Sequence, residues 1–381
     1  MFSMLIKPNI EKFAKIKVVG VGGAGGNALN TMISSGNILG VDFLAINTDK
    51  QALNMNKADE ILQIGQALTH GLGSGAMPEV GKKAAEESKE DIKKHLEGYD
   101  MIFITAGMGG GTGTGGAPIV ASLAKEAGSL TVAVVTKPFN FEGATRKENA
   151  ENGIRELKEN VDALITIPNQ KLLDLEQKSL PLKEAFALAD SVLMQGVKGI
   201  SDLIVHPGLI NVDFADVKTI MYHAGSALMG IGEAEGEGRA EIAAEQAINS
   251  PLLDVSIGGA TGILINIVGD GLTLAEVEVI SQKISSAAGI DSNIIFGANP
   301  TDNNKGKISV TVIATGFDSS YDDYDDTYKV SKRADSKVSM SEDTKSSEIE
   351  KSKDDLDKDI EQIVDDNEED PYKIPTFLRR G

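Results

Sequence analysis

Short apolar runs alternate with helix-like stretches through the first half of this chain, and that alternation restricts the possible fold more than any other feature. The runs are apolar on both faces, which is typical of parallel strands covered by helices on each side. Strands and helices alternating at this spacing predict an α/β fold with a doubly wound parallel sheet. The predicted strands are 15–21, 42–49, 60–64, 100–107, 130–138 and 162–169, and the predicted helices are 26–36, 78–97, 114–127 and 144–160.

The pattern changes after residue 181. Residues 182–205 show one long helical pattern, which we interpret as a central helix joining two domains. Beyond it we expect a smaller second α/β domain over 206–318, because only two clear helices separate four strand-like runs. The first domain would cover 15–181, after an N-terminal extension of residues 1–14. The later strand candidates are 226–234, 259–269, 293–301 and 307–316, with helices at 238–249 and 273–289.

The net charge of −20 is distributed unevenly. Residues 319–370 carry 19 acidic and 8 basic side chains, with no glycine, no proline and few large apolar groups. Such a segment cannot bury enough apolar surface to offset the loss of chain entropy, so we expect a disordered acidic linker. The last segment, 371–381, has three basic and no acidic residues and contains the apolar Ile374, Phe377 and Leu378. It is either a partner-binding peptide or a frayed terminus without a partner.

Composition excludes several classes of protein. The chain has no cysteine, which rules out disulfide-stapled domains, thiolate chemistry and cysteine-ligated metal sites. Its acidity argues against binding to nucleic acid or to an anionic membrane surface. No apolar run approaches the ~20 residues of a membrane-spanning helix, and no signal-peptide pattern is present. We therefore expect a cytoplasmic protein without direct membrane insertion.

Two glycine clusters each follow a predicted strand and open a predicted helix. The first, residues 20–27, satisfies G-x-G-x-x-G through Gly20, Gly22 and Gly25. This pattern provides a tight turn, a close backbone approach and a helix N-terminus directed at a phosphate. Alone it is a weak signal, because a glycine-rich turn without a ligand has the same appearance.

The second cluster, residues 107–116, is more informative. It contains Thr112 and Thr114 among seven glycines, and glycine at that density weakens helix and strand alike. Two such turns on one parallel sheet can converge on a single polyphosphate. The pattern GxxxxGK[ST] occurs nowhere in the chain. Backbone N–H groups, helix dipoles and Mg²⁺ would then have to balance the phosphate charge.

Candidate residues for the rest of a nucleotide follow later elements. Glu142 and Arg146 lie four apart where a helix begins, so they share a face, as an ordinary surface ion pair also would. Asn169 follows a predicted strand. Phe186 and Asp190 also lie four apart, where an aromatic ring could stack on a base and a carboxylate could accept the paired N–H donors of guanine. Core packing for Phe186 and a solvated helix face for Asp190 remain equally open.

Acidic residues gather in the segment after the long helix. Asn211, Asp213 and Asp216 lie within six residues, where carboxylates are usually caps or solvated turn residues. Their spacing matches no calcium loop, and the four histidines form no metal-ligand pattern. We therefore expect no direct metal ligands from the protein.

Together these motifs resemble the FtsZ family, the bacterial branch of the tubulin superfamily of GTPases. GGGTGTG (109–115) is similar to the superfamily's glycine-rich signature, and NVDFADV (211–217) to its activating loop. KPFNFEG (137–143) and FLAINTD (43–49) also match. The resemblance covers 15–316 and extends to the linker and the terminal peptide IPTFLRR. It departs from the usual pattern at His70 and Met77, in a loop expected near the γ-phosphate.

The resemblance implies a role for each candidate residue. Glu142 and Arg146 would contact the ribose, whereas Asn169, Phe186 and Asp190 would hold and read guanine. Residues expected to hold the phosphates of GTP or GDP, with Mg²⁺, are Gly22, Gly23, Ala24, Gly25, Gly26, Asn27, Gly109, Gly110, Gly111, Thr112, Gly113, Thr114 and Gly115.

The resemblance also implies an assembly. Asn211, Asp213 and Asp216 would act on the GTP of the next subunit, in head-to-tail filaments of the cell-division ring at the inner face of the membrane. Residues 374–380 would bind membrane-anchoring division proteins such as FtsA. Two alternatives stay open: an NAD-dependent dehydrogenase using the first glycine cluster and Asp49, and a GTP-binding relative that acts only as a static scaffold.

Overall fold

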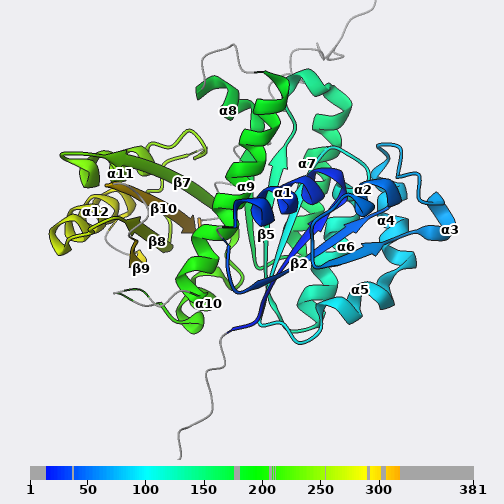
Figure 1. Cartoon of the computed structure of the whole chain (residues 1–381), viewed down its shortest axis with the longest axis horizontal. Coiled ribbons are helices and arrows are strands. Elements are labelled where there is room, and N and C mark those ends of the chain that lie inside the picture. Colours follow the sequence, from blue (N-terminus) through cyan, green and yellow to red (C-terminus); the bar gives the residue numbers. More distant parts are fainter. Residues whose placement is uncertain are drawn as a thin grey trace, which may run out of the picture. The chain divides into compact units, whose positions relative to one another are not determined.

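The computed structural model describes residues 14–36, 38–175, 181–205, 208, 210, 212–253, 255–289, 292–301 and 306–317 (Figure 1). Asn211, the expected linker 319–370 and the expected peptide 371–381 lie outside the described residues. So does nearly all of the expected extension 1–14.

Six parallel strands form the first part of the sheet, in the order β3-β2-β1-β4-β5-β6. The predicted α/β fold with a doubly wound parallel sheet is therefore confirmed. All six strands lie within one or two residues of their predicted ranges, because each is a nearly continuous apolar run. Their bounds are β1 (Ile16–Val21), β2 (Val41–Asn47), β3 (Glu60–Gln63), β4 (Met101–Gly107), β5 (Leu130–Lys137) and β6 (Ala163–Pro168).

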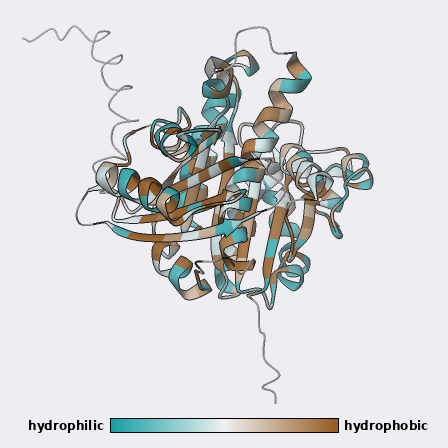
Figure 2. Ribbon diagram, turned by 60° about the vertical axis from the view of Figure 1, so that its left-hand side comes forward, coloured by the Kyte–Doolittle hydropathy of each residue, from teal (hydrophilic) through white to brown (hydrophobic). Residues whose placement is uncertain are grey.

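Helices cover both faces of these strands. Alternate strand residues such as Val18 and Phe103 pack in one core with α1 (Gly22–Ser35) and α9 (Leu182–Val205). Their neighbours Val19 and Ile104 pack in a second core against the remaining large helices. Those helices are α4 (Pro78–Glu87), α5 (Lys89–Leu96), α6 (Thr112–Glu126) and α7 (Ala144–Glu159). In Figure 2 the strands are mostly hydrophobic, whereas the helices carry both hydrophobic and hydrophilic residues.

Several helices differ from the prediction. The predicted helix 78–97 is divided at Ser88, and α1 begins at Gly22 rather than at residue 26, so the first glycine turn is part of the helix. Short helices that the hydrophobic pattern did not indicate are α2 (Lys50–Asn54), α3 (Gln66–Thr69), η1 (Asn140–Glu142), α8 (Asn169–Leu175) and α10 (Phe214–Met221).

The second half continues the same sheet. β7 (Gly225–Glu235) pairs in parallel with the start of β6 over three residue pairs and then runs antiparallel to β10 (Lys307–Thr315). The full order is β3-β2-β1-β4-β5-β6-β7-β10-β8-β9. The second half has its own core beneath two helices. Its remaining elements are β8 (Gly262–Gly269), β9 (Asn293–Pro300), α11 (Arg239–Ile248) and α12 (Leu274–Ala288).

The long helix α9 connects the two halves and lies between them (Figure 1). Its 24 residues span about 36 Å at 1.5 Å per residue. Glycines let it approach both parts of the sheet. A Cβ on Gly196 would lie 3.0 Å from Val134 of β5, and one on Gly199 would lie 2.9 Å from Thr311 of β10. Within the described residues, no helix is long and apolar enough to cross a membrane.

Candidate functional site

A cavity of about 520 Å³ opens at the carboxyl ends of the parallel strands. Ligands of open α/β sheets bind at this edge, because the loops leaving neighbouring strands converge there. Residues lining it come from the turns after β1, β2, β4, β5 and β6, from the loop before α4, and from α9. They include Gly23, Ala24, Asn47, Thr48, Asp49, Gly73, Ser74, Gly110, Gly111, Thr112, Gly113, Glu142, Arg146, Asn169, Phe186 and Asp190.

Two uncapped helix N-termini meet in this cavity. The residues before α1 and α6, Val21 and Gly111, have no side chain that accepts an N–H of the first turn, and neither first turn contains an acidic residue. Gly22, with a φ of 76°, lets the two turns approach closely, because a Cβ there would lie only 2.7 Å from the backbone nitrogen of Gly113. Free N–H groups and two helix dipoles therefore face one space, which is the usual chemistry of a phosphate site.

The glycines of the two turns serve different purposes. A Cβ on Gly23 or Gly110 would meet no atom within 4 Å, so these two residues keep space open beside the cavity. Gly25 instead permits close packing, because a Cβ there would lie 2.5 Å from a β4 carbonyl oxygen. Gly115 likewise lets α6 contact α4, and Gly109 donates its N–H to the Thr114 hydroxyl at 2.8 Å.

The structure therefore divides the predicted phosphate residues into two groups. Six of them line the cavity, and the other seven do not, although several of these support the turns through packing or hydrogen bonds. The lining group is Gly23, Ala24, Gly110, Gly111, Thr112 and Gly113, and the second group is Gly22, Gly25, Gly26, Asn27, Gly109, Thr114 and Gly115.

A cluster of three hydroxyls beside the glycine turns was not predicted. Thr112 contacts Thr48 at 2.7 Å and Ser74 at 2.9 Å between hydroxyl oxygens, and all three side chains are buried. They come from three separate segments, so no spacing within the sequence indicates the cluster. The only available signal was that Thr48 directly follows a buried strand at the ligand-binding edge. Hydroxyls placed there can reach phosphate oxygens or a metal-bound water.

The opposite side of the cavity carries an ion pair and an aromatic cluster. Arg146 donates to Glu142 at 2.7 Å, and Glu142 also accepts the backbone N–H of Phe139 at 2.9 Å. Phe139 stacks on Phe141 with ring centroids 5.2 Å apart, and both lie edge-on to Phe186. The Phe186 side chain is 41% exposed, which leaves part of its ring free for a ligand.

Two acceptor groups in the cavity lack partners. Asn169 is only 5% exposed, and its Oδ1 accepts no hydrogen bond from the described residues. Asp190 forms no hydrogen bond or ion pair with the part of the chain that the structure describes, and burial raises its pKa from 3.8 to about 6. Buried polar groups are normally satisfied, so an acceptor pair of this kind fits a ligand that brings N–H donors.

The acidic residues after the long helix do not line this cavity. Asp213 caps α10 by accepting the backbone N–H of Asp216 at 2.8 Å, and both side chains are exposed. α10 leads into Gly225, which is in register with Ala163 at the amino end of β6, whereas the cavity lies beyond its carboxyl end. α8 and α10 accordingly lie at opposite ends of α9 (Figure 1). The cavity is thus at the carboxyl ends of the parallel strands, and the acidic helix α10 is at their amino ends.

Comparison with known families identifies the fold. The model of the Tubulin/FtsZ family, GTPase domain, matches residues 15–177, and that of the FtsZ family, C-terminal domain, matches residues 225–318. An FtsZ dimer structure from M. jannaschii, described as empty, is 49% identical, covering 80% of this chain and 88% of that one, with a TM-score of 0.77. The chain belongs to the FtsZ family.

Other solved structures agree. A mutant FtsZ of M. jannaschii is also 49% identical, covers 81% of this chain and 92% of its own, and gives a TM-score of 0.78. CetZ2 from Haloferax volcanii, described as a GTPγS-bound protofilament, shares the fold at 22% identity and a TM-score of 0.71, covering 84% of this chain and 100% of its own.

Membership of the FtsZ family confirms the resemblance found in the sequence and makes this protein a GTPase with a tubulin-like fold. The dehydrogenase alternative is wrong. Asp49, on which that alternative depended, uses its Oδ1 to accept the backbone N–H groups of Gln51 and Ala52 at the start of α2.

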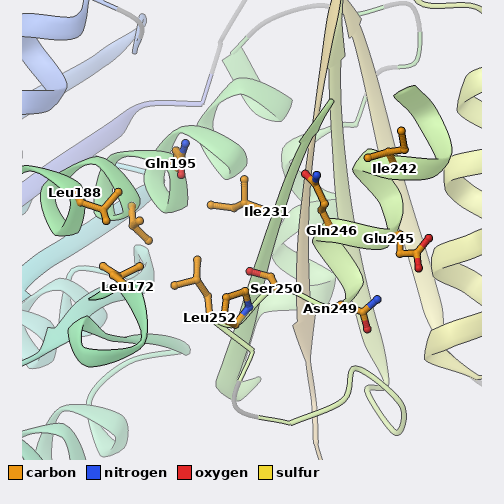
Figure 3. A pocket seen from close by; sticks show the side chains of 12 residues that line it. Leu172, Leu188, Gln195, Ile231, Ile242, Glu245, Gln246, Asn249, Ser250 and Leu252 are labelled. Carbon is orange, nitrogen blue, oxygen red and sulfur yellow. The ribbon is translucent and has the colours of Figure 1, made fainter. Parts of the chain in front are cut away.

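A second cavity, of about 590 Å³, lies between α8, α9, β7 and α11 (Figure 3). Its walls are mainly aliphatic, including Leu172, Leu188 and Ile231. Two of its polar residues are already engaged, because Glu245 pairs with Lys283 at 3.0 Å and the Gln246 carbonyl accepts a β7 N–H at 3.0 Å. None of the predicted site residues lines it, and no helix N-terminus of α1 or α6 reaches it. It lacks the chemistry of a nucleotide site.

Proposed function

We propose that this FtsZ-family GTPase assembles head to tail into filaments of the cell-division ring and hydrolyses GTP at each subunit interface. One observation carries the proposal: the cavity lies at the carboxyl ends of the parallel strands, whereas the exposed carboxylates of α10 lie at the amino ends. Only a second copy of the chain can bring the two together. A head-to-tail contact that does not close into a ring gives an open filament.

Relatives support assembly of this kind. One M. jannaschii FtsZ structure is described as a dimer, and CetZ2 from Haloferax volcanii is described as a protofilament with GTPγS bound. The exposed apolar side chains Leu72 and Phe141, near the cavity, and Leu274, at the start of α12, are available for contact between subunits. An enzyme whose catalytic group is supplied by a neighbour needs such a contact.

In this proposal the cavity binds GTP through groups that the chain already presents. The N–H groups at the starts of α1 and α6 bind the phosphates, and Gly23 and Gly110 leave the space that side chains would fill. Asp190 and Asn169 bind guanine, against which Phe186 packs. The Glu142–Arg146 pair lies beside the ribose. Adenine lacks the two adjacent N–H donors that a carboxylate such as Asp190 accepts, so we expect GTP to be preferred over ATP.

Mg²⁺ fits this site only as a companion of the phosphates. Among the described residues, no group of three or more histidine, aspartate or glutamate side chains is placed to hold a metal ion. The hydroxyls of Thr48, Ser74 and Thr112 are the nearby neutral oxygens, which suits an ion that keeps several of its waters. When bound, Mg²⁺ would neutralise phosphate charge.

The acidic helix is prepared for its role in the next subunit. The bond from Asp213 to the N–H of Asp216 fixes one carboxylate at the start of α10 and leaves the other exposed in the first turn. Two oriented carboxylates can accept protons from an attacking water and hold it in line with the γ-phosphate. We propose that Asn211 contributes to the same site.

The ends of the chain supply the cellular context. The acidic linker 319–370 separates the GTPase from the basic, apolar peptide 374–380, which we propose binds a membrane-anchoring division protein such as FtsA. We propose that the filament accordingly lies in the cytoplasm, beside the membrane at the division site. Deletion of 371–381 should abolish that localisation and leave GTPase activity in solution unchanged. Unchanged localisation would favour a static scaffold.

A complementation experiment tests hydrolysis between subunits. The rate per subunit should rise steeply above a threshold protein concentration, and Asp216→Ala should bind GTP without hydrolysing it. A second variant, Gly110→Phe, should fail to bind GTP while keeping an intact α10. Mixing the two inactive variants should restore activity, because α10 of one can act on the GTP of the other.

Glu90→Ala is the matched control, since it removes an exposed carboxylate on α5, away from both edges. It should behave as the wild type. A rate per subunit that is independent of concentration, together with no restoration on mixing, would show that hydrolysis occurs within one subunit.

A further inference from the structure

Asp162, at the amino end of β6, is a buried carboxylate that the catalytic scheme does not use. Its side chain is 2% exposed. Oδ2 accepts the backbone N–H of Thr131 at 2.9 Å, and the backbone of Asp162 bonds to Thr131 of β5 and to Gly225 of β7. The residue therefore joins the starts of three strands.

The second oxygen of this carboxylate, Oδ1, accepts no hydrogen bond from the described residues. Two groups that can carry a positive charge lie near this oxygen but too far away for a hydrogen bond: Lys125 Nζ at 3.8 Å and His223 Nδ1 at 3.7 Å. Charge-assisted hydrogen bonds are usually 2.7–2.9 Å long, so either group could move closer by almost 1 Å. A buried carboxylate that served only to hold the strands together would be expected to have both oxygens satisfied.

The two neighbours belong to the elements that matter for catalysis. Lys125 is in the last turn of α6, whose first turn lines the nucleotide cavity. His223 is in the turn that ends α10, whose first turn carries Asp213 and Asp216. Asp162 thus lies between the far ends of the helix that binds phosphate and the helix that carries the acidic residues.

The turn at His223 has a strained backbone and an exposed side chain. Its φ is 53°, in the left-handed region, which strains any residue with a Cβ although histidine adopts it more often than most residues do. Its side chain is 63% exposed and its ring lies 4.0 Å from that of Tyr222, so no core packing fixes it. A closer bond to Asp162 would offset this strain and set the direction of α10.

We propose that Asp162 and His223 are positioning residues for hydrolysis: Oδ1 closes on His223 when α10 docks on a neighbouring subunit, and this bond holds Asp213 and Asp216 in their working orientation. The proposal rests on the proposed function, in which α10 acts on the next subunit's GTP. It assigns a role to the buried carboxylate, its unshared oxygen and the strained turn together.

The test separates catalysis from binding and assembly. His223→Asn keeps a residue that tolerates the left-handed conformation and removes the imidazole, and Asp162→Asn keeps the acceptor for Thr131 and removes the charge. With the protein well above the threshold concentration for sedimentation, each should lower kcat about three- to tenfold, a range typical of coupling between sites, while KM for GTP stays unchanged and the threshold rises by no more than the same factor. The double variant should be no slower than the single ones.

His95→Asn is the control. It removes an imidazole on α5 that is hydrogen-bonded to a different carboxylate, that of Glu60, at 2.6 Å. It should leave kcat unchanged. An unchanged kcat in His223→Asn overturns the inference, and so does a loss of rate that disappears when the protein concentration is raised well above the threshold. The inference is also overturned if the loss of kcat in the double variant equals the product of the losses in the two single variants. If Asp162→Asn does not fold, His223→Asn decides alone. A wild-type rate that is independent of protein concentration would instead refute the proposed function.

Discussion

Replacing Asp190 by asparagine should make the nucleotide-free protein more stable and a poorer GTP-binding protein. Burial without a partner raises the pKa of Asp190 from 3.8 to about 6. The folded chain therefore holds the ionised carboxylate at a cost, and a pKa difference of this size corresponds to about 3 kcal/mol at neutral pH. Asp190→Asn removes that cost and keeps the shape of the side chain.

The effect has a definite pH dependence. Above pH 6, Asp190 is ionised in the folded and the unfolded chain, and the full cost is present. As pH falls from 6 to 3.8, the folded chain takes up the proton first, so the wild type gains stability relative to Asp190→Asn. Below 3.8 both states are protonated and the difference vanishes. At pH 7.5 the variant should melt roughly 5 °C higher, and at pH 4 the two melting temperatures should coincide.

Binding should change in the opposite direction. The ionised carboxylate can accept two N–H donors of guanine, whereas an amide would face one of them with its own N–H groups. We expect affinity for GTP to fall by roughly 30-fold or more, because buried donors left unpaired cost about 2 kcal/mol. The affinity of Asp190→Asn for xanthosine triphosphate, which has a carbonyl in place of the guanine amino group, should rise relative to its affinity for GTP. Wild-type affinity for GTP should also weaken below pH 6.

Thermal melting of nucleotide-free protein and titration calorimetry with each nucleotide measure both effects. Glu90→Gln, a change in an exposed carboxylate, is the control and should alter neither. If Asp190→Asn is no more stable at pH 7.5, the carboxylate has a partner and the reasoning from burial fails. If it is more stable but binds GTP as the wild type does, Asp190 does not read the base.

Four further substitutions test the site and the second half. Gly23→Val should fill the open space beside the cavity and reduce GTP affinity by at least tenfold in calorimetry with little change in melting, whereas Gly115→Ala, whose Cβ would lie 1.9 Å from a carbonyl oxygen of α4, should destabilise the fold. Phe186→Ala should weaken GTP binding about tenfold if the ring stacks on the base, measured by the same titration. Arg239→Met should destabilise by about 1–3 kcal/mol in denaturant unfolding at pH 7, since Arg239 binds Glu276 at 2.6 Å. That bond lowers the pKa of Glu276 from 4.5 to about 2, so this stabilisation is present above 4.5 and is lost as pH falls towards 2.

The sequence indicated the parallel strands and both glycine turns because each depends on local pattern. β1 and β4 are apolar runs interrupted only by Lys17 and Thr105 respectively, and each is followed directly by its turn. What escaped prediction depends on distant contacts. The hydroxyl cluster joins three segments, and the single sheet depends on only three residue pairs between β6 and β7. α10 was missed because its eight residues are too few for a clear helical period.

The glycine clusters predict a phosphate site, and in the structure their residues divide more finely than a motif can indicate. Gly23 and Gly25 are two apart in the same turn. The first leaves space for a ligand, and the second lets a helix touch a strand. Both functions require the absence of a Cβ, so composition and spacing cannot separate them. Only the direction in which each missing Cβ would point distinguishes them.

Unsatisfied buried groups mark the places where this fold accepts a cost. In the part of the chain that the structure describes, Asn169 Oδ1 and Asp162 Oδ1 are buried without a hydrogen bond, and Asp190 is a carboxylate without a partner. Asn169 and Asp190 line the cavity, whereas Asp162 lies between α6 and α10. Nothing in the structure explains the similar state of Thr105 Oγ1, Asn266 Oδ1 and Ser281 Oγ. Natural sequences depart from local satisfaction mainly at functional sites, so the same argument supports both proposals, that Asp190 binds the base and that Asp162 positions α10 for hydrolysis.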